Sequence, residues 1–152
     1  MTKFICGVDP GKTGALAIVD TDGRLIDVMD MPDATGAALG AAIGALLADW
    51  SPHTIDQAWV EEVHAMPKQG VTSSFNFGAN FGAIGGALGA LGIPVRYVTP
   101  AKWKKAQRVT ADKNSSRQRA RELWPADAGR FARVKDDGRA EAALIALHGV
   151  TA

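Results

Sequence analysis

The sequence has little cysteine and no long apolar run, and these two absences exclude two classes of protein. Cys6 is the single cysteine among 152 residues, so no internal disulfide can form and a reducing compartment is expected. No apolar stretch approaches the roughly 20 residues that a membrane-spanning helix needs. The opening run MTKFICGVDPG turns polar too soon for a signal peptide, so no membrane partner is expected.

The remaining composition is typical of a globular protein. Hydrophobic residues make up 47% of the chain and charged residues 22%. A chain of this length fits one domain, residues 1–152, and buries roughly two-thirds of the surface that its unfolded form exposes. Cys6 lies within an apolar run, which predicts a buried and chemically inert thiol.

Charge is distributed unevenly along the chain. Residues 1–95 contain four Lys or Arg and ten Asp or Glu, a balance of −6. Residues 96–152 contain thirteen basic and six acidic residues, a balance of +7. An acidic half joined to a basic half is expected of a protein that binds a polyanion and also holds cations. The alternative is an ordinary solvated charged face.

Apolar patterns and turn residues divide the chain into strands and helices. Three N-terminal strands are predicted at Phe4–Asp9, Ala15–Asp20 and residues 24–31, and two more at residues 57–63 and 93–98. Helices are predicted at residues 35–50, 73–91, 100–106, 114–124 and 137–148, and a loop at residues 126–134. This order predicts a mixed α/β domain whose first three strands form an antiparallel meander.

Acidic residues stand in two apolar strands where a lone acid would be unfavourable. Asp9 ends an apolar strand before a Pro-Gly turn, and Glu61 and Glu62 interrupt the apolar run AWV. Strand alternation puts Glu61 and Glu62 on opposite faces, so at most one of them can face Asp9. Each acid alone could be a turn cap or a solvated strand end.

A third group of acids opens the last predicted helix. Asp137 and Glu141 are four residues apart and share a helix face, where their repulsion would be relieved by a metal ion. Asp136 is the neighbouring candidate, and Asp137 could also be the helix N-cap. Carboxylates converging from different elements are the ligands that Mg²⁺ prefers, and two such ions can hydrolyse a phosphodiester.

The segment Gly11–Thr13 reads GKT but does not form a phosphate-binding loop. The phosphate-loop pattern needs a glycine five residues before Gly11, and that position is Cys6. No other nucleotide-binding fingerprint is present, so no nucleotide cofactor is expected.

Three segments resemble a known nuclease family. GVDPGKTGALAIVD looks like the first strand and turn of the RuvC-type Holliday-junction resolvases, members of the RNase H-like superfamily. VEEVHAMPKQGVTSSFNFG is similar to the second acidic motif of the phage-associated branch, and KDDGRAEAALIALHG to the last motif. The motifs follow in the family's order over nearly the whole chain. The resemblance implies an RNase H-like fold with a five-stranded mixed sheet flanked by helices.

The resemblance also implies the residues of a metal site. The family's acids correspond to Asp9, Glu61 and Glu141, which would act as catalytic and metal-binding residues. Bacterial resolvases have an acid or a histidine three residues before the last carboxylate, where this chain has Gly138. Asp137 is the natural substitute because it shares a helix face with Glu141, and Asp136 remains open.

Basic residues are expected to bind the phosphates of DNA. Trp103, among the lysines, is expected in the core or as a platform beneath them. Phe75 or Phe77 could wedge between bases or belong to the core, and His64 and His148 are expected to be structural or surface residues. The candidate DNA-binding residues are Lys68, Gln69, Lys102, Lys104, Lys105, Arg108, Lys113 and Arg117.

The leading functional hypothesis is a structure-selective endonuclease that resolves four-way DNA junctions by symmetric nicking. It would use Mg²⁺, with Mn²⁺ also supporting activity and two ions per site, in the cytoplasm of a bacterial cell and encoded by the host or a phage. A homodimer is implied, and the glycine-rich helix at residues 73–91 could form its interface or pack tightly on its own sheet. The alternatives are a nuclease for other branched DNA or RNA–DNA hybrids, and a non-catalytic junction-binding protein.

Overall fold

The computed structural model describes residues 2–50 and 54–152 and has a central five-stranded sheet. Its order is β3-β2-β1-β4-β5. β1 pairs antiparallel with β2, and β2 with β3, whereas the β1–β4 and β4–β5 pairs are parallel. This arrangement confirms the predicted mixed sheet. The strands are β1 (Phe4–Asp9), β2 (Ala15–Asp20), β3 (Leu25–Asp30), β4 (Ile55–Glu61) and β5 (Val95–Val98).

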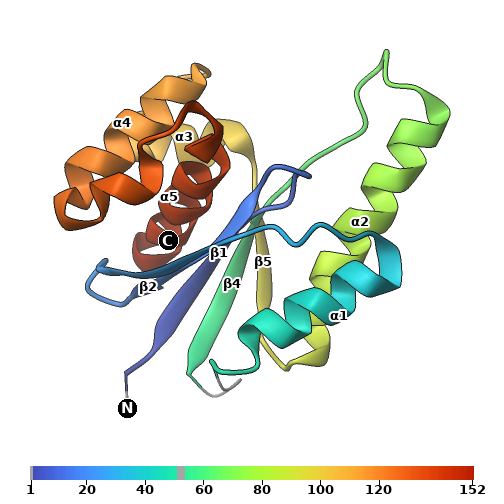
Figure 1. Ribbon diagram of the computed structural model, residues 1–152, viewed down its shortest axis with the longest axis horizontal. Helices are drawn as coiled ribbons and strands as arrows, with labels where there is room; N and C mark the ends of the chain where they lie inside the picture. The colour runs from blue at the N-terminus through green and yellow to red at the C-terminus, as the bar shows by residue number, and fades with distance from the viewer. Residues whose placement is uncertain (1, 51–53) are drawn as a thin grey trace.

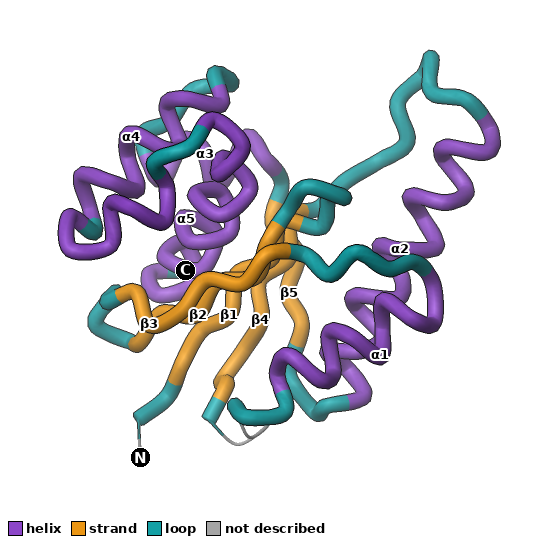
Figure 2. Tube along the Cα trace, viewed as in Figure 1, coloured by secondary structure: helices purple, strands orange, loops and turns teal. Residues whose placement is uncertain are grey.

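Helices cover both faces of the sheet (Figure 1). They are α1 (Gly36–Leu47), α2 (Val71–Ala90), α3 (Pro100–Gln107), α4 (Lys113–Leu123) and α5 (Asp137–Thr151), with two 3-10 helices, η1 (Pro125–Phe131) and η2 (Val134–Asp136). On one face α5 packs on β1 and β2 beside α3 and α4, and α1 and α2 pack together on the other. Figure 2 shows the strands as the layer between these two groups. No helix within residues 2–50 and 54–152 is long and apolar enough to cross a membrane.

The hydrophobic core lies on both faces of β1, because successive strand residues point to opposite sides. Ile5 belongs to the cluster beneath α5, whereas Cys6 and Val8 belong to the cluster beneath α1 and α2. Cys6 is fully buried, as predicted, and burial raises the pKa of its thiol to about 12. The thiol is therefore neutral and unreactive at physiological pH.

Gly7 in β1 allows α5 to lie directly on the sheet. A Cβ atom at this position would come within 2.2 Å of the Ala142 carbonyl oxygen and 2.3 Å of the Ala146 nitrogen. Only a residue without a side chain permits so close an approach of helix and strand. The contact fixes α5, and the acids that it carries, against the strand that ends in Asp9.

The predicted loop at residues 126–134 is instead partly helical. It contains most of η1, which begins at Pro125, and it buries Phe131 with the Phe131 and Trp124 ring centroids 6.2 Å apart. Aromatic burial explains the difference, because the tight 3-10 turns bring Phe131 into the core. Smaller differences concern β4, which begins and ends two residues before its predicted bounds, and α2, which begins two residues early.

Most glycines of α2 do not pack against the rest of the chain. Apart from the helix's own neighbouring backbone, no atom of residues 2–50 and 54–152 lies within 4 Å of a Cβ placed at Gly78, Gly82, Gly86 or Gly89. A Cβ at Gly85 would come within 2.9 Å of the Tyr97 hydroxyl. Gly85 therefore packs tightly on the sheet, whereas the other four α2 glycines do not.

Candidate active site

The centre of the candidate site is Asp9, the last residue of β1. The Gly11 backbone N–H donates a hydrogen bond of 3.2 Å to Asp9 Oδ1, which fixes the carboxylate over the turn. The turn then folds back so closely that a Cβ at Gly14 would come within 2.0 Å of the Asp9 carbonyl oxygen. The Pro-Gly turn and Gly14 therefore hold the chain in a tight reversal that exposes the end of β1 to neighbouring elements.

Glu61 lies beside Asp9 because β1 and β4 are parallel neighbours. Val8 pairs with Val60, so the next residue of each strand is an acid at the same edge of the sheet. The Trp103 indole Nε1–H of α3 donates a hydrogen bond of 2.7 Å to Glu61 Oε2. Trp103 is fully buried and Lys104 Nζ lies 5.6 Å from its ring centroid, so both expected roles, core residue and platform, are met.

The first turn of α5 supplies the remaining acids, Asp137 and Glu141. A Cβ at Gly138 would lie 2.2 Å from the Thr13 carbonyl oxygen, so the helix start packs directly on the turn after Asp9. No acidic side chain can occupy position 138 without moving this backbone. Asp137 and Glu141, one helical turn apart, both face Lys113, which places Asp137 rather than residue 138 beside Glu141.

Asp136 is directed away from this cluster. Its side chain is buried, with Oδ1 2.8 Å from the Arg133 guanidinium, and its Oδ2 accepts a hydrogen bond from the Arg133 backbone N–H. Burial alone would raise the pKa of Asp136, but the hydrogen bonds from Arg133 lower it overall. Of the two candidates that the sequence left open, Asp136 therefore stabilises the start of α5, and Asp137 lies with the other acids.

The carboxylates of the site are crowded and short of positive charge. Burial, then the negative charge of Glu141, raises the pKa of Asp9 to about 7, and a side-chain hydrogen bond with Glu141 adds to the shift. Burial also raises the pKa of Glu61, despite the opposing hydrogen bond from Trp103. Buried acids that repel one another are stabilised by a cation.

Lys113, the first residue of α4, forms ion pairs with two of these acids. Its Nζ lies 3.5 Å from Asp137 Oδ2 and 3.6 Å from Glu141 Oε1, while 65% of its side chain is exposed. Burial lowers the pKa of Lys113, but the charges of Glu141, Asp137 and Asp9 raise it overall. This exposed ammonium group partly neutralises the cluster from the solvent side.

The donor chemistry of the site fits a divalent cation such as Mg²⁺ or Mn²⁺. Four carboxylates converge from three elements, and oxygen ligands are those that these ions prefer; they are Asp9, Glu61, Asp137 and Glu141. Within the described ranges, no three acidic, His or Cys side chains already stand at ligand spacing.

The predicted DNA-binding residues fall into exposed and internally bonded groups. Lys68, Lys102, Lys105 and Arg108 are exposed, and Lys104 is half-buried. Gln69 organises its own loop: its Oε1 accepts a hydrogen bond from the Met66 backbone N–H and its Nε2 donates one to Ser73.

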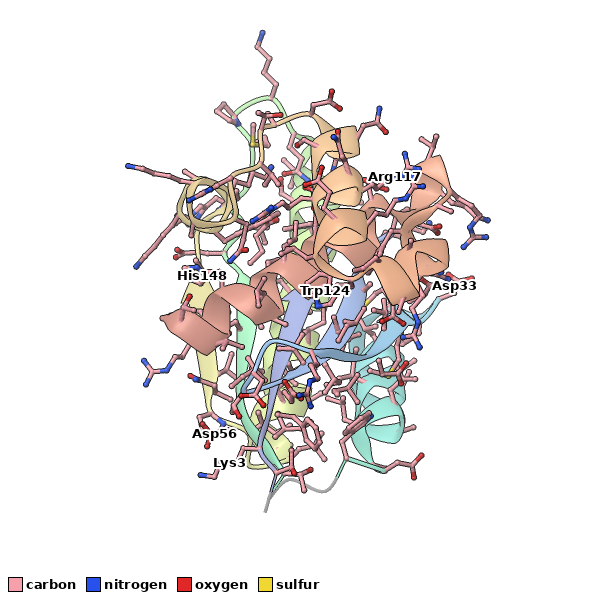
Figure 3. The ribbon with its side chains drawn as sticks, turned by 90° about the vertical axis from the view of Figure 1, so that its left-hand side faces the viewer. Lys3, Asp33, Asp56, Arg117, Trp124 and His148 are labelled. Atoms are coloured by element: carbon pink, nitrogen blue, oxygen red, sulfur yellow. The ribbon has the colours of Figure 1, made fainter. Side chains whose placement is uncertain are left out.

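Arg117 differs from the other predicted phosphate contacts. Its guanidinium donates hydrogen bonds to the carbonyl oxygens of Phe131 and Ala132 and to Asn114 Oδ1, joining α4 to the end of η1. Figure 3 shows Arg117 on α4 at this junction. Because its donors are used within the protein, we leave Arg117 out of the proposed DNA surface.

Sequence reasoning missed a basic hollow that the turn after Asp9 helps to line. Lys12, Arg133 and Lys135 line a cavity of about 350 Å³ together with Asp30 and Arg139. Arg139 is paired with Asp30 at 2.7 Å, whereas Lys12 and Lys135 are exposed and form no ion pair with a described residue. These cations lie far apart in the sequence, so no local charge run pointed to them.

Several other predicted side chains have clear positions. His64 is exposed, and His148 is buried with its ring 5.3 Å from that of Trp59 in an edge-on arrangement. Phe75 is 75% exposed and therefore outside the core, whereas Phe77 is half-buried.

Comparison with solved structures shows that this chain is similar in fold to RuvC of Thermus thermophilus. The chain matches RuvC in complex with a Holliday junction substrate at a TM-score of 0.71 and 22% identity, covering 97% of this chain and 93% of that one. A second Thermus thermophilus RuvC structure matches at a TM-score of 0.66 and 23% identity, with the same coverage. No protein-family model matches the chain, and no curated protein does. At these identities the likeness shows a RuvC-like fold.

Proposed function

We propose that this chain is a metal-dependent endonuclease that resolves four-way DNA junctions. One observation carries the proposal: acids from β1, β4 and α5 converge at a single edge of a RuvC-like sheet, and exposed lysines lie on α3 and in the hollow that Lys12 and Lys135 line. The similar Thermus protein is in complex with a Holliday junction substrate. The membership of a phage-type branch and the cytoplasmic location remain predictions from the sequence.

The acids would hold the metal, and neighbouring residues would orient the acids. When bound by Asp9, Glu61, Asp137 and Glu141, divalent ions would supply the Lewis-acid chemistry that phosphodiester hydrolysis needs. Trp103 fixes one oxygen of Glu61 through its indole N–H. The Gly11 N–H holds one oxygen of Asp9 in the same way.

Lys113 has a different function in this proposal. It is exposed, and its ion pairs with described residues are those with Asp137 and Glu141, so a metal bound by these acids would free its ammonium group. The long, flexible lysine stem would then let the ammonium contact a DNA phosphate beside the site. Lys113 would therefore neutralise the acids in the absence of metal and bind the substrate in its presence.

Two basic surfaces would position the DNA across the acids. Lys102, Lys104 and Lys105 of α3 form one of these surfaces, and Lys12 and Lys135 belong to the other. Phosphate contacts of this kind set affinity and register without reading sequence. A strand crossing from one surface to the other would pass over Asp9.

A homodimer belongs to the proposal because a junction presents two strands for symmetric cutting. The four α2 glycines without close neighbours support it, since small residues allow another helix to approach closely. Val71 and Phe75, which are 88% and 75% exposed on the same helix, add apolar surface. Sedimentation or light scattering across a concentration series tests this part separately.

A substrate panel at one salt concentration tests the proposed function. We expect cleavage of a four-way junction with Mg²⁺ or Mn²⁺, and much slower cleavage of a flap, an RNA–DNA hybrid and a linear duplex. Faster cleavage of the hybrid or the flap would support the corresponding alternative nuclease. Tight junction binding without cleavage of any substrate would indicate a non-catalytic junction-binding protein.

A further inference from the structure

The β5 strand forms one edge of the sheet, and no strand among the described residues pairs with its outer side. Its one neighbour there is β4, with which it runs parallel from Val95 to Val98. Figure 2 shows β5 at the opposite end of the sheet from β3. An unpaired strand edge offers a row of backbone donors and acceptors to another chain, so proteins either block such an edge or use it for binding.

The outward-facing backbone groups of this edge belong to Val95 and Tyr97. The carbonyl oxygens of Pro94 and Val98 accept hydrogen bonds of 2.9 Å and 2.7 Å from N–H groups of β4 and of the residue that follows it. Successive strand residues direct their N–H and C=O groups to opposite sides, so those of Val95 and Tyr97 point away from β4. Each of these two residues therefore presents one donor and one acceptor to an added strand.

Positive charge predominates around the β5 edge. Residues 63–111, which include α2, β5 and α3, contain six Lys or Arg and no Asp or Glu. Arg96 is exposed and forms no ion pair with another described residue, and Lys102 is exposed at the start of α3. Burial, then the charge of Lys102, lowers the pKa of His148, so this neighbouring imidazole is neutral at physiological pH. The edge therefore suits an occupant that carries negative charge.

The two faces of the β5 edge differ in chemistry. Tyr97 lies on the α2 side, where its ring centroid is 5.6 Å from that of Phe81, and it is 47% exposed. Arg96 points to the opposite face, where its register partner Trp59 packs against His148 of α5. His148 is labelled in Figure 3. A strand added here would meet aromatic rings on one face and a cation on the other, which favours apolar and acidic residues in alternation.

We propose that the β5 edge binds an extended acidic peptide segment of a partner protein, which adds a sixth strand to the sheet. The peptide backbone would bond to the outward groups of Val95 and Tyr97. Its carboxylates would face Arg96 and Lys102, and its apolar side chains would cover the rings of Tyr97 and Phe81.

The backbone pattern of the edge favours a peptide over a nucleic acid. Phosphate oxygens are acceptors, so they would leave the outward carbonyl oxygens of Val95 and Tyr97 without donors, whereas a peptide supplies both kinds of group in alternation. The four residues of β5 lie between Pro94 and the Pro100 that begins α3, so the bound segment is about four to six residues long.

Amide hydrogen exchange with a synthetic peptide tests the added strand. The probe is a blocked six-residue peptide of alternating Glu and Val, and its control has the same composition with three Glu before three Val. We expect saturable binding of the probe below about 1 mM and slower exchange of the Val95 and Tyr97 N–H groups. The Arg96 and Val98 N–H groups, which face β4, should exchange as before. Equal binding of the control, or no saturable binding of the probe up to about 1 mM, would overturn the proposal.

A charge reversal tests the preference for acidic residues. Arg96→Glu should weaken binding of the probe by roughly tenfold, because a favourable charge pair becomes a repulsive one. Arg24→Glu is the matched control, since Arg24 is exposed and directly precedes β3 at the other edge of the sheet. Both variants should keep the wild-type unfolding midpoint and rate of junction cleavage. Unchanged affinity of Arg96→Glu for the probe would contradict the proposal.

Two competing occupants have signatures of their own. If DNA covers the edge, a four-way junction should slow exchange of the Val95 and Tyr97 N–H groups, and Arg96→Glu should weaken junction binding. If a second copy of the chain covers it, the same N–H groups should become protected as the protein concentration rises without peptide. Either result would overturn the proposal. The probe should bind Asp9→Asn as tightly as the wild type, so the inference is tested separately from the nuclease assignment.

Discussion

The indole N–H of Trp103 donates a hydrogen bond of 2.7 Å to Glu61 Oε2, so a buried tryptophan of α3 orients a carboxylate at the end of β4. Burial and the charge of Glu141 raise the pKa of Glu61, and this bond is the largest of the interactions that oppose them. Two lysines, Lys104 and Lys113, act in the same direction through their charges. The geometry of the acids therefore depends on residues outside the acidic motifs.

Trp103→Phe should raise the pKa of Glu61, because it removes the donor and keeps most of the ring. Carboxylate ligands act in the ionised form, so the acidic limb of the pH–rate profile should move to higher pH. The profile of junction cleavage between pH 5 and 9 measures this. Trp124→Phe is the matched control, since its N–H donates to the Gly23 carbonyl oxygen away from the site. A Trp103→Phe profile that coincides with that of the control would contradict the orienting role.

The metal-free protein should lose stability as pH rises from about 4 to about 7. Burial, then the charge of Glu141, raises the pKa of Asp9 from 3.8 to about 7, so the folded state keeps a proton that the unfolded chain has already released. The folded state binds more protons in that interval, and its stability therefore falls with rising pH. The expected loss is a few kcal/mol at most, at about 1.4 kcal/mol per pKa unit.

Urea unfolding in EDTA at pH 4.5, 6 and 8 measures this loss. Asp9→Asn cannot ionise and should show a smaller decrease, whereas Glu62→Gln, one residue beyond the end of β4, should resemble the wild type. Addition of Mg²⁺ at pH 8 should raise the wild-type stability and leave Asp9→Asn nearly unchanged. An identical pH dependence of Asp9→Asn and the wild type would count against a raised pKa of Asp9 in the folded state.

Lys113→Gln should strengthen metal binding and weaken catalysis. The ammonium lies within 3.6 Å of Glu141 and 3.5 Å of Asp137, so it competes with a divalent ion for these oxygens. Without it, Mn²⁺ should bind severalfold more tightly in the absence of DNA, as titration by electron paramagnetic resonance can show. Junction cleavage should slow by roughly tenfold or more, since one phosphate contact is lost. Weaker Mn²⁺ binding would show that Lys113 supports the ligands instead of competing with the metal.

Gly138→Ala should destabilise the protein by about 1–3 kcal/mol through overpacking. Its Cβ would lie 2.2 Å from the Thr13 carbonyl oxygen, and both the turn and α5 are fixed by other contacts. Gly44→Ala in α1 is the control, because a Cβ there meets no atom of a described residue within 4 Å and alanine favours a helix. Chemical denaturation should show a lower midpoint for the first variant and an equal or higher one for the second. Equal midpoints for Gly138→Ala and the wild type would contradict the close contact.

The sheet and most of the acids could be predicted from local patterns. Apolar alternation and turn residues are properties of short segments, and they placed β1 and β2 at their observed bounds. Asp9 and Glu61 were recognisable as candidate site residues, because an acid at the end of an apolar strand is unfavourable unless a partner or a ligand stabilises it. The loop assignment at residues 126–134 was wrong because the 3-10 turns depend on the burial of Phe131 against Trp124.

The parts that could not be predicted depend on contacts between distant segments. Nothing local distinguishes Asp136 from Asp137, and the choice depends on the ion pair of Asp136 with Arg133 and the approach of Lys113 to Asp137. The bond between Trp103 and Glu61 joins residues 42 positions apart. Such pairs form when the helices pack on the sheet. No short segment of the sequence shows which helix residue will contact which strand residue.

Cleavage of a branch-migrating four-way junction by the wild type and by Asp9→Asn is the most direct test of the account. With Mg²⁺ present, the wild type should introduce symmetric nicks in two opposite strands. Asp9→Asn should bind the junction with unchanged affinity and cut it at least roughly a hundredfold more slowly, while Glu62→Gln should cut normally. Wild-type cleavage by Asp9→Asn would contradict the assignment of Asp9 as the centre of the site.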